Sequence, residues 1–207
     1  MPSNRSASAA RSQILTALKE DHKRVKKAYR DFQKIDTEAN PEACGALVGQ
    51  VLDELTVHAA LEEELLYPAL RGAMAEESLI DEAEVEHDSI HSFIDRLRSM
   101  SPDDDKYAAH FTVLCEYVLH HVKEEEGEMF PQLEHTRLDW EGLAAEMSER
   151  RDELTAAGEG SGKTPDRVRG PGPGPQDGTQ QTRGAHGASH KPARGHEASD
   201  NTAPERP

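Results

Sequence analysis

The chain has 207 residues, of which 35% are hydrophobic and 31% are charged, as in ordinary globular domains. Aromatic residues make up only 4%, so we expect an aliphatic core, which suits helices better than strands. The formal net charge is -16, and so acidic a surface repels phosphate backbones and anionic lipids. We therefore expect neither nucleic acid nor a membrane surface as a partner.

The sequence carries no sign of export. Cys44 and Cys115 are too few cysteines for the disulfide scaffold of a small secreted domain. The first residues, MPSNRSASAARSQIL, lack the apolar stretch of a signal peptide. No run of about 18 apolar residues predicts a transmembrane helix. We expect a cytoplasmic protein.

Four stretches carry apolar residues at steps of three and four, the period of one buried helical face. In chain order, the apolar residues that mark these helices are Ile14, Leu18, Val25, Tyr29 and Phe32; Val48, Val51, Leu55 and Leu65; Ile80, Ala83, Ile94 and Leu97; and Phe111, Leu114, Val118 and Met129. Four helices with short connections predict an all-α fold, an up-down-up-down antiparallel four-helix bundle.

Prolines set the expected helix boundaries. Asn40-Pro41 separates the first two helices, Tyr67-Pro68 ends the second, Ser101-Pro102 opens the fourth, and Phe130-Pro131 ends it. A short fifth helix, around Trp140 to Leu154, is expected to pack across an end of the bundle.

The composition changes after about Leu154. Residues 155–207 are rich in Gly, Pro, Ser and Thr, and they carry seven Lys or Arg and six Asp or Glu, so the net negative charge belongs to the preceding residues. Too few apolar side chains are present in this stretch to offset the entropy of ordering the chain. We predict a folded domain over residues 10–154 and a disordered Gly/Pro-rich tail over residues 155–207.

Ionisable residues interrupt each apolar stripe. Residues four apart stack on one helical face, so the following side chains should point inward: His22, His58, Glu62, His87, His91, His121 and Glu125. Any one inward histidine is more typical of an ordinary core residue, but buried carboxylates without partners are very unfavourable. A cation between the helices would compensate them, and imidazole with carboxylate suits iron, manganese or zinc.

The second and fourth helices repeat each other. HAALEEELLYP begins at His58 and HVKEEEGEMFP begins at His121, and in both a Glu follows the His by four residues and an aromatic residue precedes the Pro. Two helices with the same His/Glu pair predict a pseudo-symmetric site for two metal ions bridged by carboxylates. The neighbouring residues Glu63, Glu64, Glu124, Glu126 and Glu128 are expected to be solvated.

His22 within EDHKRV, together with H58-x-x-x-E62, H87-x-x-x-H91 and H121-x-x-x-E125, resembles the hemerythrin/HHE cation-binding domain family over roughly Ile14 to Leu133. The resemblance implies a hemerythrin-like bundle with two non-haem iron ions, bridged by oxo or hydroxo. It also implies that Glu62 and Glu125 bridge the irons and that the histidines are terminal ligands. The oxygen carriers of the family place Asp where this sequence has Glu126, so the chain is nearer the wider HHE branch.

The resemblance also implies a function. Seven protein ligands cannot fill every coordination position of two irons, so we expect an open position that binds oxygen, peroxide or nitric oxide. That predicts oxygen binding or sensing, or a role in oxidative or nitrosative stress. A catalase-like or nitric oxide-reducing di-iron enzyme and an iron storage or delivery protein are alternatives. A ferritin-like site would have its His three residues after the Glu, the reverse of the order here.

Overall fold

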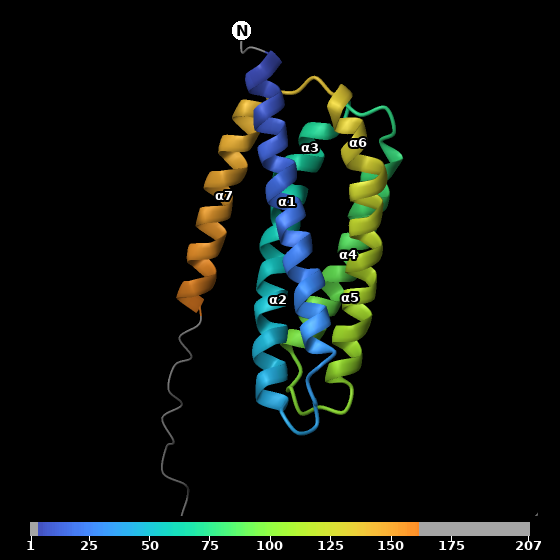
Figure 1. The fold of residues 1–207 in the computed structure, drawn as a ribbon, viewed down its shortest axis with the longest axis vertical. Coiled ribbons are helices and arrows are strands. Elements are labelled where there is room, and N and C mark those ends of the chain that lie inside the picture. Colours follow the sequence, from blue (N-terminus) through green and yellow to red (C-terminus); the bar gives the residue numbers. More distant parts are fainter. Residues whose placement is uncertain (1–3, 162–207) are drawn as a thin grey trace, which may run out of the picture. The chain divides into compact units, whose positions relative to one another are not determined.

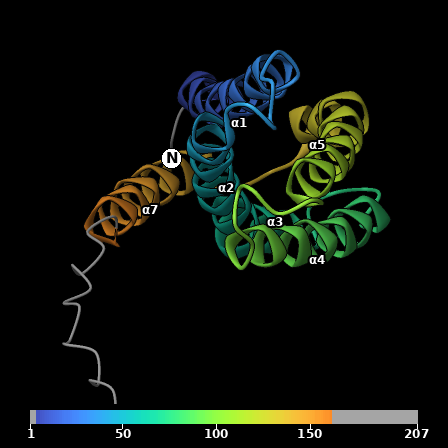
Figure 2. The same cartoon turned by 90° about the horizontal axis from the view of Figure 1, so that it is seen from below.

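The computed structural model describes residues 4–161, and no strand occurs in that range. Four long helices form the bundle (Figure 1), and they are α1 (Asn4–Phe32), α2 (Pro41–Leu61), α4 (Ser78–Arg98) and α5 (Tyr107–Glu124). Successive long helices run antiparallel, and seen from below they surround a common interior (Figure 2). The predicted all-α, up-down-up-down four-helix bundle is confirmed.

The prediction that α2 and α5 end before Pro68 and Pro131 is wrong. Each α-helix passes into a π-helical turn, η1 (Glu62–Leu66) or η2 (Glu125–Met129). Helical structure then continues past the proline as α3 (Tyr67–Leu70) and α6 (Phe130–Gln132), the latter followed by the 3-10 turn η3 (Leu133–His135). Each proline lies in the first turn of its new α-helical segment, where its missing N–H costs little.

Two apolar clusters fill the bundle, one on either side of a polar layer. The first contains Leu18, Leu61 and Leu133, and the second contains Val25 and Phe111. Among the described side chains, the buried polar or charged residues are Asp21, His22, His58, Glu62, His87, His121 and Glu125. These buried polar and charged residues are therefore all members or near neighbours of the predicted metal site.

The fifth helix, α7 (Trp140–Ser161), lies along α1 and α2 and not across an end of the bundle as expected (Figures 1 and 2). Trp140, Leu143 and Met147 hold it there by packing into the first apolar cluster. The helix also continues beyond Leu154, so the tail predicted from residue 155 begins inside α7. The rest of that predicted tail, residues 162–207, lies outside the described residues.

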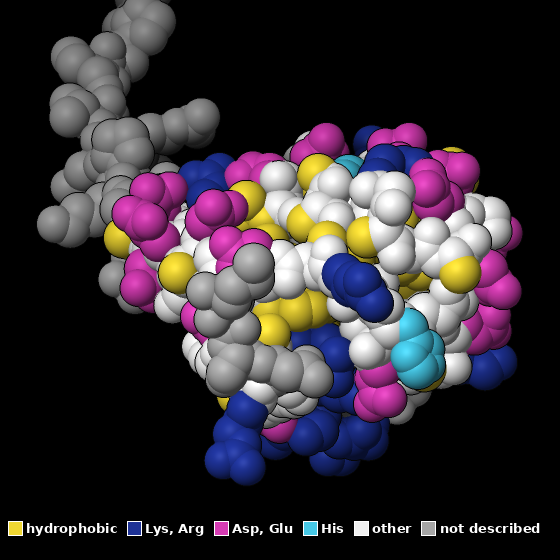
Figure 3. Space-filling view, turned by 90° about the horizontal axis from the view of Figure 1, so that it is seen from above, with side chains coloured by type: hydrophobic (Ala, Val, Ile, Leu, Met, Phe, Trp, Pro, Cys, Tyr) yellow, Lys and Arg dark blue, Asp and Glu magenta, His cyan; other side chains and the backbone are white. Residues whose placement is uncertain are grey.

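Surface charge is uneven. Helix α1 carries eight Lys or Arg and three Asp or Glu. In the view from above, Lys and Arg side chains gather on one side of the molecule, and acidic side chains are spread over the rest of that face (Figure 3). Several α1 cations are already paired: Lys23 with Glu20 at 2.6 Å and Lys27 with Asp31 at 2.7 Å. Within residues 4–161, no helix is both long enough and apolar enough to cross a membrane.

Candidate metal centre

Six ionisable side chains from four long helices and two π turns converge in the polar layer. Each is buried, and together they form two overlapping groups of possible ligand atoms: His22, His58, Glu62 and Glu125 in one, and Glu62, His87 and His121 in the other. Glu62 belongs to both groups, so it lies between two potential cation positions. The structure thus brings together six of the seven residues that the sequence predicted as ligands.

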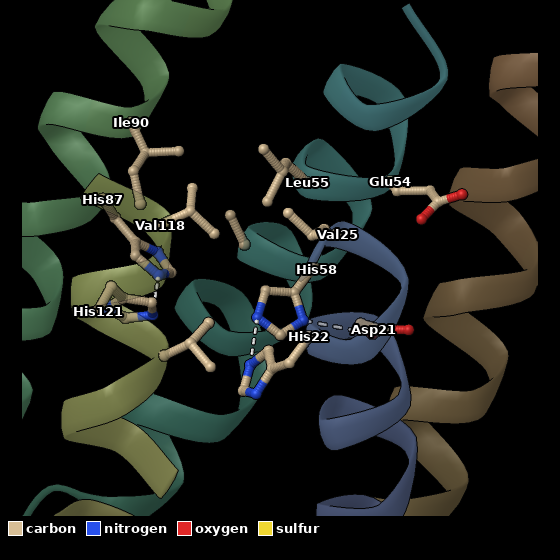
Figure 4. Close-up of a pocket in the computed structure, with 12 residues that line it drawn as sticks. Asp21, His22, Val25, Glu54, Leu55, His58, His87, Ile90, Val118 and His121 are labelled. Atoms are coloured by element: carbon tan, nitrogen blue, oxygen red, sulfur yellow. Dashed lines mark hydrogen bonds and ion pairs between the residues drawn. The ribbon is translucent and has the colours of Figure 1, made fainter. Parts of the chain in front are cut away.

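The histidines form two facing pairs (Figure 4). Nε2 of His22 lies 3.2 Å from Nε2 of His58, and Nε2 of His87 lies 3.1 Å from Nε2 of His121. Each pair joins two helices, α1 with α2 and α4 with α5. The four inward-facing nitrogens are therefore arranged as two matched sets.

The outer nitrogen of each histidine, Nδ1, contacts a carboxylate. The four contacts are His22–Glu126 at 2.9 Å, His58–Asp21 at 3.2 Å, His87–Glu63 at 2.7 Å and His121–Glu86 at 2.9 Å. An ionised carboxylate only accepts hydrogen bonds, so in each contact Nδ1–H is the donor. A neutral ring then presents an unprotonated Nε2 lone pair to the interior, which is the state of a metal-binding histidine.

Glu62 and Glu125 lie between the two histidine pairs. Oε2 of Glu62 is 3.2 Å from His58 Nε2 and 3.6 Å from His87 Nε2. Oε2 of Glu125 is 3.2 Å from His22 Nε2 and 3.5 Å from His121 Nε2. Each carboxylate thus reaches both pairs, as a bridging ligand must.

Two carboxylate oxygens in this layer are left without hydrogen bonds. Oε1 of Glu62 and Oε2 of Glu125 are buried and find no hydrogen-bond partner among the described residues. A buried oxygen without a partner costs about 1–3 kcal/mol, and more when it is charged. Facing lone pairs and orphaned carboxylate oxygens together fit a site built for cations.

Burial and the neighbouring charge of Glu125 raise the pKa of Glu62 well above its usual value. Burial acts in the same direction on Glu125, but the neighbouring histidines His22, His121 and His58 lower the pKa of Glu125 to about 2. Without a metal, the raised pKa of Glu62 therefore favours a proton on that carboxyl. A bound cation would displace that proton, so metal binding should release protons.

Tyr67 is a member of the site that the sequence reasoning missed. Its hydroxyl lies 3.3 Å from Oε1 of Glu125 and 3.5 Å from Oε2 of Glu62. Burial and these two carboxylates raise the pKa of Tyr67 well above its usual value, so the hydroxyl stays protonated. The internal repeat of the sequence could have indicated this position, because Phe130 is its equivalent in the second copy. Phe130 stacks on His22 with ring centroids 6.1 Å apart.

His91 is the predicted ligand that the structure does not bring into the group. Its side chain is 39% exposed, and its Nε2 lies 2.7 Å from Oε1 of Glu63, which also accepts the hydrogen bond from His87. His91 lies one turn along α4 from His87, whereas Glu62 lies level with His87. His91 therefore faces the outer carboxylate and not the interior.

The two adjacent glutamates of η2 have different positions. Glu125 points into the cluster, whereas the side chain of Glu126 is 33% exposed and contacts His22 Nδ1 and Lys26. The expectation that Glu63 and Glu126 are merely solvated is wrong, because each orients a histidine through Nδ1. The sequence pattern could not indicate these contacts, because both glutamates lie at the half-exposed edge of a helix. From there a long glutamate side chain can still reach back to the core.

A small cavity adjoins the facing histidines (Figure 4). Its volume is about 20 Å³, enough for one water-sized or diatomic molecule. The walls between the two histidine pairs are apolar and include Val25, Leu55, Ile90 and Val118. The cavity thus has no room for a large substrate.

Four antiparallel helices that hold two histidine pairs and two shared carboxylates define a helical metal-binding protein. The family model for the hemerythrin HHE cation-binding domain matches residues 13–133, more than half of the chain. The chain belongs to this family.

Two relatives extend the comparison. A solved structure of a hemerythrin HHE cation-binding domain-containing protein from Mycobacterium kansasii is 27% identical, with a TM-score of 0.57, and the match covers 70% of this chain and 91% of that one. A curated protein named DNA nickase from Nostoc is 25% identical over 140 residues, which are 66% of this chain. The match spans only 36% of the length of the Nostoc protein.

Proposed function

We propose that this protein binds two non-haem iron ions through six residues. His22 and His58 hold one iron, His87 and His121 hold the other, and Glu62 and Glu125 bridge them. The single observation that carries the proposal is the pair of facing Nε2 contacts, each between rings whose Nδ1–H is already donated to a carboxylate. Lone pairs held so close repel each other unless a cation lies between the rings.

The donor set favours iron. Four imidazoles and two carboxylates form a mixed nitrogen and oxygen environment, and imidazole suits iron, zinc and copper, whereas carboxylate suits manganese and magnesium. Two bridging carboxylates fit a pair of ions of higher coordination number. A structural zinc site, by contrast, is closed by four ligands around one ion.

We further propose that the open coordination positions bind a small molecule, namely oxygen, peroxide or nitric oxide. When bound, iron would supply the vacant positions and the redox chemistry. The chain supplies a small, mostly apolar cavity beside the four histidines. The role we favour is oxygen binding or sensing, or a response to oxidative or nitrosative stress, in the cytoplasm.

Turnover of peroxide or nitric oxide is the second candidate. The observation that favours it is the Tyr67 hydroxyl, a buried protonated group 3.3 Å from Oε1 of Glu125. Such a group can hold a proton beside the reacting molecule. The activity named for the Nostoc protein is not extended to this chain, because a net charge of -16 opposes binding to a phosphate backbone.

The test is an anaerobic preparation of the full chain, analysed for metal and then exposed to oxygen, peroxide and nitric oxide in turn. We expect close to two irons per chain and a spectral change on adding at least one of these molecules. A preparation from iron-replete cells with one zinc and no iron would overturn the di-iron proposal.

Two histidines of α4 provide a matched pair of variants for the ligand set. His87→Ala should lose most of its iron, because it removes an inward Nε2. His91→Ala should retain iron, because its side chain contacts Glu63 outside the cluster. Equal loss in both variants would contradict the six-residue ligand set.

A further inference from the structure

Helix α7 lies outside the matched residues 13–133 and yet reaches the metal centre. Its residue Arg151 binds the carboxylate of Asp21 with both terminal nitrogens, Nη1 to Oδ1 at 3.1 Å and Nη2 to Oδ2 at 2.7 Å. Such a two-point contact fixes the orientation of the carboxylate as well as its position. Asp21 is buried, so this contact is shielded from solvent on the carboxylate side.

Asp21 in turn holds His58. Its Oδ2 accepts the hydrogen bond from His58 Nδ1 at 3.2 Å (Figure 4), and a second arginine, Arg24, contacts Oδ1. A continuous chain of polar contacts therefore runs from Arg151 through Asp21 to the imidazole whose Nε2 faces His22. Arg151 is the link of that chain that α7 contributes.

His58 differs in this respect from the other three histidines. Their partner carboxylates, Glu126, Glu63 and Glu86, are between one-fifth and about one-third exposed. The partner of His58 is buried, so it cannot rely on water to balance its charge. Burial acts to raise the pKa of Asp21, but the hydrogen bonds from His58 and Arg151 lower it far below its usual value.

We propose that Arg151 is a positioning residue for the metal centre, which fixes Asp21 and through it the ring of His58. The inference rests on the proposed role of His58 as a ligand. Outer partners of this kind orient the ring, fix its tautomer and raise its basicity as a ligand. Docking of α7 and metal binding then stabilise each other, because a coupling between two binding events is reciprocal.

The adjacent residue, Arg150, provides the matched control. It also makes a two-point contact from α7 to the bundle, with Nε 2.7 Å from Oε2 and Nη2 3.0 Å from Oε1 of Glu64. Glu64 is 46% exposed, and its ion pair is with Arg150 and not with a residue of the cluster. Arg150→Met and Arg151→Met therefore remove the same kind of pair from the same helix, and only Arg151→Met breaks the path to His58.

The experiment loads the full chain with cobalt(II) and follows metal loss to a chelator, together with the visible absorption of the bound cobalt. We expect Arg151→Met to lose cobalt about tenfold faster than the wild type, the lower end of the range for outer-shell changes. Its visible bands should shift, because the ring of His58 moves. Arg150→Met should keep the bands and stay within about twofold in rate, as expected for an exposed pair.

Arg151→Lys distinguishes positioning from charge. Lysine keeps the positive charge but cannot make the two-point contact, so its cobalt bands should shift in the same direction as those of Arg151→Met. Equal loss rates and identical spectra for Arg150→Met and Arg151→Met would overturn the inference, since α7 would then act only through its docking. His58→Ala separates the two proposals, because if it bound metal normally the ligand set itself would be wrong.

Discussion

Glu62 is the side chain through which the chemistry of the site can be tested most directly. It begins a π turn, it is buried among four histidines and a second carboxylate, and its raised pKa favours the protonated carboxyl in the metal-free protein. The same residue would lose that proton to bridge two cations. Burial of this carboxyl therefore destabilises the metal-free protein, and the same carboxyl would bridge the two metal ions.

Glu62→Gln should change how the stability of the metal-free protein depends on pH. The folded pKa of Glu62 lies above its unfolded value of 4.5, so its contribution to stability is present below pH 4.5 and is lost as pH rises. Glutamine does not titrate, so the variant should gain stability relative to the wild type as pH rises. Urea unfolding at several pH values measures this difference.

Glu63→Gln is the control for this prediction. Burial acts to raise the pKa of Glu63, but hydrogen bonds from His87 and His91 outweigh burial and lower that pKa. A constant difference between Glu62→Gln and wild type would contradict the buried proton.

Tyr67→Phe should separate metal binding from the polarity of the site. The six ligands are unchanged, so metal content should stay close to wild type. Glu125 loses a hydrogen bond, so the absorption of the metal-loaded protein should shift and the free energy of unfolding should fall by about 1 kcal/mol. Metal analysis, absorption spectra and denaturant unfolding measure the three effects. A spectrum identical to that of the wild type would show that the hydroxyl does not interact with the bound centre.

The two π turns are the elements that place the two carboxylate ligands. Glu62 and Glu125 each open a turn that inserts a wider step into the helix, and such turns are frequent at functional sites. The wider step brings Tyr67, which follows η1, close to the carboxylates. In the same way it brings Phe130, which follows η2, onto His22. The internal repeat in the sequence therefore corresponds to a repeated local distortion and not only to a repeated ligand pair.

Helical periodicity could predict which residues face inward, because one period holds along each helix. His22, His58, Glu62, His87, His121 and Glu125 all interrupt apolar stripes, and all are buried. Periodicity could not show how far along α4 the site extends, so it also predicts His91 as a ligand. Nor could it show the π turns, since Pro68 and Pro131 give the same signal at the end of a helix and at a distorted turn. The outer carboxylates and Arg151 depend on side-chain reach between helices, which no local pattern carries.

A pair of glycines in α2 tests its packing against the connection between α4 and α5. A Cβ at Gly45 would lie 2.5 Å from Cγ of Pro102, whereas a Cβ at Gly49 would have no neighbour within 4 Å. Gly49→Ala should therefore stabilise the protein by about 0.5–1 kcal/mol, because alanine is the better helix former. Gly45→Ala should lack this gain or destabilise, since Pro102 must move. Denaturant unfolding of both variants measures this, and an equal gain at both positions would show that Pro102 does not pack against α2.

Over the whole bundle, the polar layer divides the apolar core into two clusters. An interior divided in this way needs a compensating cation at its centre, so metal and fold should be coupled. Metal that binds only the folded state stabilises it by mass action, by about 4 kcal/mol at a thousandfold excess over the Kd.

Removing the metal with a chelator should therefore lower the Tm, and calorimetry at several metal concentrations measures the shift. Glu62→Ala and Glu125→Ala should bind little iron and show little metal-dependent shift. In metal-free form Glu62→Ala should be as stable as the metal-free wild type or more so, because it removes a buried carboxyl whose pKa burial raises, at the expense of a small cavity. Metal-free Glu125→Ala should be less stable, because the neighbouring histidines lower the pKa of Glu125 and so stabilise its charged form in the fold. Strong destabilisation of both metal-free variants with iron content intact would make these glutamates structural partners of the histidines.

The most direct test of the two-metal centre is a crystal structure of the iron-loaded protein with anomalous scattering measured at the iron edge. We predict two peaks about 3.5–4 Å apart, the spacing of two-metal sites, between Glu62 and Glu125. One peak should lie within bonding distance of Nε2 of His22 and His58, and the other of Nε2 of His87 and His121. A single peak, or iron bound only at surface groups such as Glu86, His120 and Glu124, would contradict it.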